Sequence, residues 1–298
     1  MDVTSLLKFI GYNSLFTASV VLLSFVLGWV LYRYVILRKI NLRDSLFDKD
    51  NVAAWFEFIG AFIFPTLYLA ANAIIGSASD NIITDLLICL AYAVIYILIF
   101  TILRLLTGAF VHSIKLSDAS GKVSLNNEIY VQKNVSASLF SIAFSLIFVS
   151  FIKFLDFTST DDLVTSLLRM SSILVFTLAA FTVYCLILRR KTSLISEIFI
   201  DNNIAAGVSF LGFIFAVQII LDNAIQVQGN FVFLDLIIIS AVGLVLLGIF
   251  SIIFKWLFSK IVKVNFWKEI YEQNSIGAAI GQCALYIGIA NIIVSFMK

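Results

Sequence analysis

The sequence predicts an all-α polytopic membrane protein with eight transmembrane helices, and three observations lead to this fold class. The hydrophobic fraction is 61%, charged residues make up 13%, and the mean hydropathy is +1.06, far from the composition of a soluble domain. Eight apolar stretches reach the roughly 20 residues that cross a bilayer as a helix. A nine-residue phrase recurs before every second stretch, which indicates repeated two-helix units.

The eight expected spans are separated by short loops. They are residues 14–37, 52–75, 84–111, 134–155, 164–188, 203–225, 231–258 and 275–297. No loop is long enough to hold a separate catalytic domain. The first span is too long for the apolar region of a cleavable signal peptide, so we expect it to stay as a membrane anchor.

The repeated phrase reads aliphatic, aromatic, three mostly polar residues, Asn or Ser, Val or Ile, and two small residues. We call each copy an elbow, and elbows 1 to 4 are residues 46–54, 129–137, 198–206 and 270–278. The sixth position holds Asn51, Asn134, Asn203 and Ser275. Side chains of this type cap a helix N-terminus, and the small residues that follow allow close helix approach in lipid. The simplest interpretation is a membrane re-entry device. The alternative is four elbows that converge on a vestibule.

The basic residues predict the orientation of the chain. Most of the 20 Lys and Arg residues lie in the loops before the even-numbered spans, while the opposite face collects Asp residues. By the positive-inside rule, the elbow loops are cytoplasmic and both termini lie outside.

The chain also has a longer repeat of about half its length, because the second and sixth spans share one sequence pattern. Each begins Asn-x-Ala-Ala, has a mid-helix Gly (Gly60 and Gly212), and ends in Asn-Ala-Ile. We therefore expect two four-helix repeats, residues 1–157 and 158–298. An even number of helices in each would place them parallel, about an axis near the membrane normal.

This half-chain pattern resembles the bacterial inner-membrane YjfL-like family, known as domain of unknown function 350. The resemblance rests on Asn-x-Ala-Ala, the mid-helix Gly, Asn-Ala-Ile, Pro65 and Arg104. It covers nearly the whole chain as two tandem copies. Ala216 replaces Pro65 in the second half, and Lys255 stands near the place of Arg104.

The resemblance implies a location and a cellular context, but no reaction, because the family has no settled activity. It implies a multi-pass protein of the bacterial inner membrane. Similar genes neighbour membrane-stress proteins of the phage shock type and polyamine- or glutathione-linked ligases. The implied role is envelope maintenance, with a peripheral membrane-stress protein as the partner at the cytoplasmic loops.

Three ionisable residues inside the expected spans are candidates for function, since a buried charge is costly unless it is paired. Glu57 lies in the second span between two Phe residues, and its counterpart in the second half is Ser209. Snorkelling to the cytoplasmic interface is the simplest account of Arg104 and Lys255. An ion pair between Arg104 and Glu57 is the alternative.

Four further intramembrane residues have a structural and a functional interpretation. Gln218 and Gln282 lie deep in their spans, where polar glue between helices is the default. Asp222 lies near the outer end of its span, where solvation is the simpler account. Pro65 removes a helical hydrogen bond, which neighbouring groups can restore, and the resulting kink is fixed geometry or a hinge.

The sequence gives no support for catalysis or for a cofactor. His112 is the single histidine, the three cysteines fall in separate spans, and no glycine-rich phosphate loop is present. We therefore expect no enzyme, no metal site and no cofactor. A net charge of +2 requires no nucleic acid, since anionic lipid headgroups suffice for the basic loops.

Two functions follow from these observations. The first is a structural or regulatory protein of envelope or membrane-stress maintenance that docks a partner at its elbows. The alternative is a channel or transporter for ions or small polycations, with a path between the repeats lined by Glu57, Gln218, Gln282, Asn72 and Asn291. Assembly into a homo-oligomer is open under both.

Overall fold

The computed structural model describes residues 3–74, 82–114, 123–153, 163–189, 192–226 and 232–297, and every element in them is a helix. The long helices are α1 (Val3–Leu31), α3 (Phe64–Ile74), α4 (Ile82–Ser113), α6 (Val135–Lys153), α7 (Leu163–Arg189), α9 (Ile204–Gln226), α10 (Val232–Ile261) and α11 (Ile276–Phe296). The short ones are η1 (Tyr32–Leu37), η2 (Asp44–Asp48), α2 (Val52–Trp55), η3 (Phe56–Ile63), α5 (Leu125–Tyr130), α8 (Leu194–Phe199) and η4 (Lys268–Glu272).

Eight helical segments are long and apolar enough to cross a membrane, which confirms the predicted number of spans. The first joins α1 to η1, and the second runs continuously through α2, η3 and α3. The π-helical geometry of η1 and η3 was not predicted. Such segments are uncommon inside α-helices and often mark functional positions.

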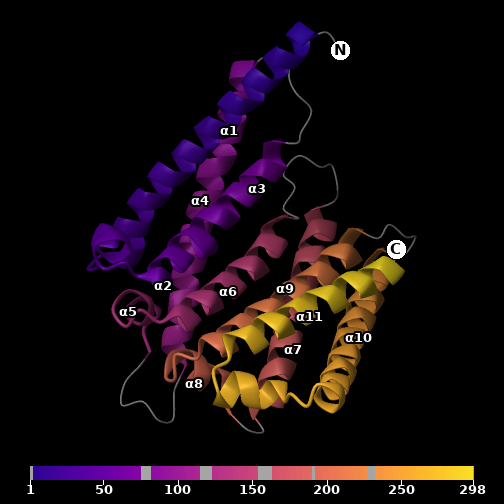
Figure 1. The fold of residues 1–298 in the computed structure, drawn as a ribbon. Helices are drawn as coiled ribbons and strands as arrows, with labels where there is room; N and C mark the ends of the chain where they lie inside the picture. The colour runs from indigo at the N-terminus through magenta and orange to yellow at the C-terminus, as the bar shows by residue number, and fades with distance from the viewer. Residues whose placement is uncertain are drawn as a thin grey trace.

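The even-numbered spans form a central row. The most extensive helix contact joins α9 to α11, followed by α6 with α9 and α6 with η3. Figure 1 shows α3, α6, α9 and α11 side by side in this order, with α1, α4, α7 and α10 packed outside them. The row positions all four elbows at one end of the molecule (Figure 1).

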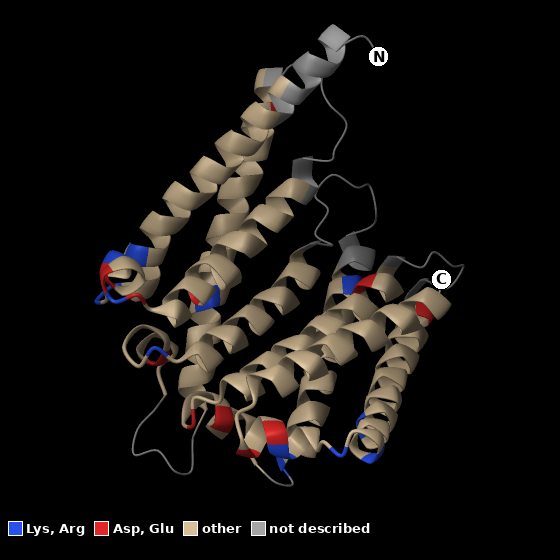
Figure 2. Ribbon diagram, viewed as in Figure 1, with Lys and Arg blue, Asp and Glu red and all other residues tan. Residues whose placement is uncertain are grey.

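Charged side chains gather at the ends of the helices. Figure 2 shows Lys, Arg, Asp and Glu mainly around the elbows, and the middle of the helices is almost free of them. The start of α1 and the end of α11 lie at the opposite end of the bundle from the elbows. This distribution is the one expected for a multi-pass membrane protein.

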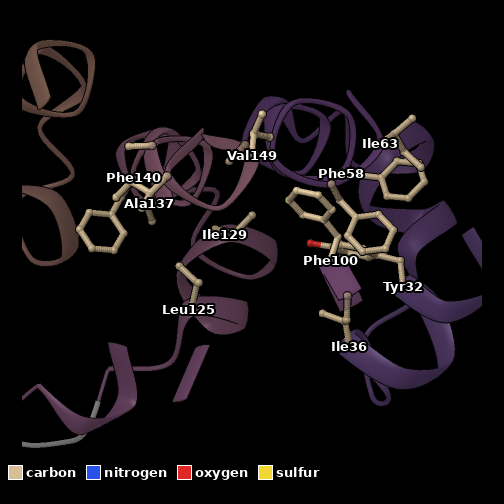
Figure 3. Packing of buried hydrophobic residues seen from close by; sticks show 14 of the residues in the cluster. Tyr32, Ile36, Phe58, Ile63, Phe100, Leu125, Ile129, Ala137, Phe140 and Val149 are labelled. Carbon is tan, nitrogen blue, oxygen red and sulfur yellow. The ribbon is translucent and has the colours of Figure 1, made fainter. Parts of the chain in front are cut away.

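The row is packed with aromatic residues. In the first half Tyr32 packs edge-on against Phe58, with ring centroids 5.2 Å apart (Figure 3). Phe140 of α6 stacks on Phe210 of α9 at 5.5 Å and meets Phe199 of α8 edge-on at 5.3 Å. An aromatic seam therefore joins the two halves of the chain.

Candidate functional site: four elbows and two buried polar clusters

Each elbow is a short helix that turns sharply into an even-numbered span. The turn lies at the fifth elbow position, where Asp50, Lys133, Asn202 and Asn274 all have positive φ, between 44° and 58°. Asn and Asp tolerate this conformation better than most residues because their short polar side chains bond locally. None of these positions is glycine, so the turn was not recognisable from glycine spacing.

The sixth elbow position caps the span that follows. Asn51, Asn134 and Asn203 accept a hydrogen bond from the backbone N–H three residues later, at 3.3, 2.9 and 2.9 Å. Ser275 makes the same bond at 3.4 Å. The capping oxygen satisfies one of the unpaired N–H groups of the first turn.

The same asparagines also link one elbow to the next. The Asn51 side-chain amide donates to the carbonyl of Ile129 at 2.8 Å. Asn134 donates to Ile198, and Asn203 to Ile270, both at 2.9 Å. In every case the acceptor is the first residue of the following elbow. Three equivalent bonds therefore tie four elbows into one row.

The two ends of this row are closed. The equivalent carbonyl in elbow 1, that of Leu46, accepts the indole N–H of Trp55 at 3.0 Å. At the other end, Ser275 has a capping oxygen but no amide group to donate. The serine in the fourth copy lacks the amide that the three linking asparagines share, and this difference is the sequence signal that could have revealed the linking role.

Carboxylates support two of the linking asparagines. Glu128 accepts from Asn134 at 3.3 Å, and Glu197 accepts from Asn203 at 2.8 Å. Burial raises the pKa of Glu128, and the bond from Asn134 offsets part of this rise. Both carboxylates lie in the short elbow helices α5 and α8, and sequence reasoning missed them.

A buried charged cluster joins the second and third spans to the elbow helix α5 in the first half. Arg104 forms an ion pair with Glu57, and their side chains are 5% and 0% exposed. Snorkelling, the simplest expectation for Arg104, is therefore wrong. The ion pair explains why, since withdrawing either charge would leave the other buried and unpaired. The Nη2 atom of Arg104 also donates to Asn126 at 2.8 Å, so the guanidinium is held on two sides.

Two tyrosines complete this cluster. The hydroxyl of Tyr32 donates to Glu57 Oε1 at 3.1 Å, and Tyr130 donates to Tyr32 at 2.8 Å. Burial, with the neighbouring Tyr32 and Glu57, raises the pKa of Tyr130 well above its ordinary value, which keeps it a donor. Glu57 Oε2 has no hydrogen-bond partner among the described residues.

A second cluster occupies the corresponding place in the second half without a carboxylate. Tyr184 bonds Ser209 at 3.2 Å, and 25 residues separate them, as they separate Tyr32 from Glu57. Tyr184 also bonds Tyr271 at 3.0 Å. Gln282 donates to Ser209 at 2.7 Å. Hydroxyl and amide groups thus replace the acid of the first half.

Lys255 extends this second cluster. Its Nζ atom donates to the hydroxyl of Tyr286 at 2.8 Å, and Gln282 donates to the same hydroxyl at 2.9 Å. Lys255 therefore has a protein partner inside its span, and snorkelling, the expectation for this side chain too, does not describe it. Gln282 of α11 donates to Ser209 of α9. This is the polar contact between helices that we expected for Gln282.

The remaining candidates lie apart. Gln218 donates to Thr177 on α7 at 3.2 Å. Asp222 is half-buried on α9, whereas we expected a solvated side chain. Asn291 is exposed and bonds its own helix at Ile287. The side chain of Asn72 lies outside the described residues. The hydrogen bonds of Gln218 and Asn291 in the described part of the chain reach neither Glu57 nor Gln282.

The turn that contains Pro65 is bonded to a neighbouring helix. Pro65 is buried near the start of α3 and has no N–H group to donate. The carbonyl of Ala61, one turn earlier, accepts the hydroxyl of Ser145 from α6 at 2.6 Å. A neighbouring helix therefore bonds a carbonyl in the turn that Pro65 disrupts.

Comparison with known proteins supports the family for the second half of the chain. A family model described as Domain of Unknown Function (DUF350) matches residues 158–297. This half of the chain is a DUF350 domain. The match contains elbows 3 and 4 and the cluster around Ser209, and it confirms the family that the sequence resembles. The tandem copy in residues 1–157 stays a prediction. No curated protein and no solved structure matches the chain.

Proposed function

We propose that this protein is a non-enzymatic scaffold of the bacterial inner membrane, in which two tandem DUF350 repeats hold four cytoplasmic elbows in one rigid row. The observation that carries the proposal is the series of three Asn-to-carbonyl bonds between successive elbows. Such a series fixes the spacing of the elbows, which is what a docking face for a peripheral protein needs.

The two halves of the chain support the tandem arrangement. Elbows 1 and 3 and the Tyr-to-acceptor pairs recur at matching positions, and the family pattern carries over to the first half in Asn51, Gly60 and Pro65. Residues 1–157 and 158–298 would then form a fused pair. Its internal interface is the aromatic seam between α6 and α9.

The partner that we propose is a peripheral membrane-stress protein, in line with the role that the resemblance implies. The experiment is complementation of a deletion strain after dissipation of the proton gradient, using wild type, Asn134→Ser and Asn134→Ala. Serine keeps the cap and removes the amide donor, as Ser275 does naturally. We expect Asn134→Ser to lower survival although the protein inserts normally. Full survival with both variants would refute a function based on the rigid row.

Transport is the second candidate function, and one observation favours it. Glu57 is fully buried inside the membrane, and one of its carboxylate oxygens is without a hydrogen bond in the described region, as in proton and cation pathways. The packed aromatic rings at Phe140 and the separate positions of the polar residues count against a path between the halves. Proteoliposomes decide this: flux of protons, potassium or polyamines that Glu57→Gln abolishes would replace the scaffold proposal.

A further inference from the structure

A small cavity lies between α10 and α11, where Lys255 extends the second cluster. Its volume is about 10 Å³, which is room for one water-sized atom. The polar groups around it belong to Lys255, Ser251, Gln282 and Tyr286, and apolar side chains, among them Phe254, line the rest. Lys255 is half-buried and Phe254 is 41% exposed, so the cavity lies near the outer surface of the bundle. We call it the Lys255 pocket.

The polar groups of the Lys255 pocket include more hydrogen-bond donors than acceptors. A lysine ammonium has three N–H donors, and Lys255 uses one of them on the hydroxyl of Tyr286 at 2.8 Å. That hydroxyl also accepts from Gln282 at 2.9 Å, and among the described residues no acceptor takes its own hydrogen. Ser251 is 8% exposed, and its Oγ atom has no hydrogen-bond partner in the described part of the chain. A ligand that satisfies these groups must therefore be an acceptor.

No carboxylate in the described part of the chain balances the charge of Lys255, which forms no ion pair there. The helix α11 contains no acid. The single acids of α9 and α10, Asp222 and Asp235, lie toward the helix ends that are far from the elbows. The first half balances its buried guanidinium with Glu57, but Ser209 replaces this acid in the second half. Because a charge inside a span is costly unless it is paired, the acceptor that fits the Lys255 pocket is an anion.

The depth of the pocket brings it within reach of lipid phosphates on the elbow side. The helix α10 has 30 residues and is about 45 Å long, whereas the hydrocarbon core of a bilayer is about 30 Å thick. Each end of a centred, upright α10 therefore extends roughly 7 Å beyond the core. Lys255 precedes the last residue, Ile261, by about 9 Å along the axis, which is the edge of the core. The adjacent Trp256 is 59% exposed, as is typical of the membrane interface.

We propose that the Lys255 pocket binds a phosphate oxygen of an anionic phospholipid from the leaflet on the elbow side. The ammonium of Lys255 supplies the counter-charge, and the hydroxyls of Ser251 and Tyr286 are the further donors. The Tyr286 ring, whose centroid is 5.0 Å from Nζ, holds the ammonium at the pocket. Since the cavity has room for a single oxygen atom, the rest of the headgroup stays outside the helix pair. Basic pockets between spans are typical sites for anionic headgroups.

Native mass spectrometry of the purified full chain in detergent tests the ligand. The probes are phosphatidylglycerol and phosphatidylcholine with the same acyl chains, with inorganic phosphate as a competitor at constant ionic strength. We expect the chain to retain phosphatidylglycerol more tightly than phosphatidylcholine, and inorganic phosphate to leave this retention unchanged. Equal retention of the two lipids would overturn the assignment to an anionic lipid. Displacement of phosphatidylglycerol by inorganic phosphate would assign the pocket to a soluble anion and overturn the lipid as its source.

Matched variants test the assignment to this pocket. Lys255→Met removes the ammonium, and we expect about a tenfold loss of affinity for phosphatidylglycerol, as for a lost hydrogen bond to a charged group. Ser251→Ala should lower the affinity about threefold. The control is Lys260→Met, at an exposed lysine of the same helix, which should leave the affinity unchanged. Full affinity of Lys255→Met, or equal losses for the two lysine variants, would overturn the proposal. An unchanged circular dichroism spectrum verifies that each variant folds.

Discussion

The two buried clusters have the same frame but different chemistry. In the first half a tyrosine, an ion pair and an asparagine join η1, η3, α4 and α5. In the second half a tyrosine, a serine, a glutamine and a lysine join α7, α9, α10 and α11. The comparison teaches that the frame does not depend on the ion pair, because the second half keeps the bond from the tyrosine at the same positions with a serine in place of the acid.

The largest expected effect comes from breaking the ion pair. Glu57→Leu leaves the Arg104 guanidinium buried without a counter-charge, and we expect a loss of about 3–5 kcal/mol in the free energy of unfolding. The matching change in the second half, Ser209→Ala, removes neutral hydrogen bonds and should cost about 1–2 kcal/mol. Denaturation in detergent micelles measures both.

A double variant separates pairing from packing in that comparison. Glu57→Met with Arg104→Met removes both charges together, and replacing a buried ion pair by apolar residues is often neutral or stabilising. We therefore expect the double variant to be more stable than Glu57→Leu. If it is equally unstable, the cluster is held by shape and not by charge.

A smaller effect is expected from crowding the contact between α9 and α11. A Cβ atom on Gly212 would lie within 2.6 Å of both the Cα and the Cβ of Cys283, so Gly212→Ala should cost about 1–3 kcal/mol. Gly288→Ala, where the new methyl group meets open space, is the matched control. Equal melting temperatures for the two variants would show that the helices separate without cost.

The bond between the halves at the elbows should contribute less. Asn134 donates across the boundary to Ile198, and Asn134→Ser removes this bond but keeps the cap, at a cost of about 1 kcal/mol. Asn134→Ala removes the cap as well and should cost about 1 kcal/mol more. Identical stabilities would mean that serine at this position does not cap.

The smallest effect concerns pH. Because burial raises the pKa of Glu128 in the folded state, the folded state binds more protons, and stability rises as the pH falls toward the ordinary glutamate value. Glu128→Gln keeps an acceptor for Asn134 and should flatten this dependence above the ordinary glutamate pKa. Melting curves between pH 4 and 8 check it. An unchanged slope would place the titration at another group.

Much of the fold was predictable, since eight apolar stretches and the capped elbows depend on local sequence alone. The positive φ at the fifth position of each elbow was harder to predict. In elbow 2 this position is Lys133, a residue type that does not favour the left-handed conformation. The pairing of Glu57 with Arg104 stood only as an alternative, because the helix row that brings them together depends on packing between distant spans. The Asn-to-carbonyl bonds were missed for the same reason, since Asn51 and Ile129 are 78 residues apart.

The indole of Trp55 has a consequence for evolution. A fused chain with a closed first elbow has a defined order of units, so each unit is free to diverge separately from its neighbours. A ring of identical subunits could not keep a glutamate at one position and a serine at the equivalent one, because every mutation would appear in all copies. Fusion therefore gives the row a direction, from the ion pair at Glu57 in the first half to the hydroxyl group of Ser209 at the equivalent position in the second half.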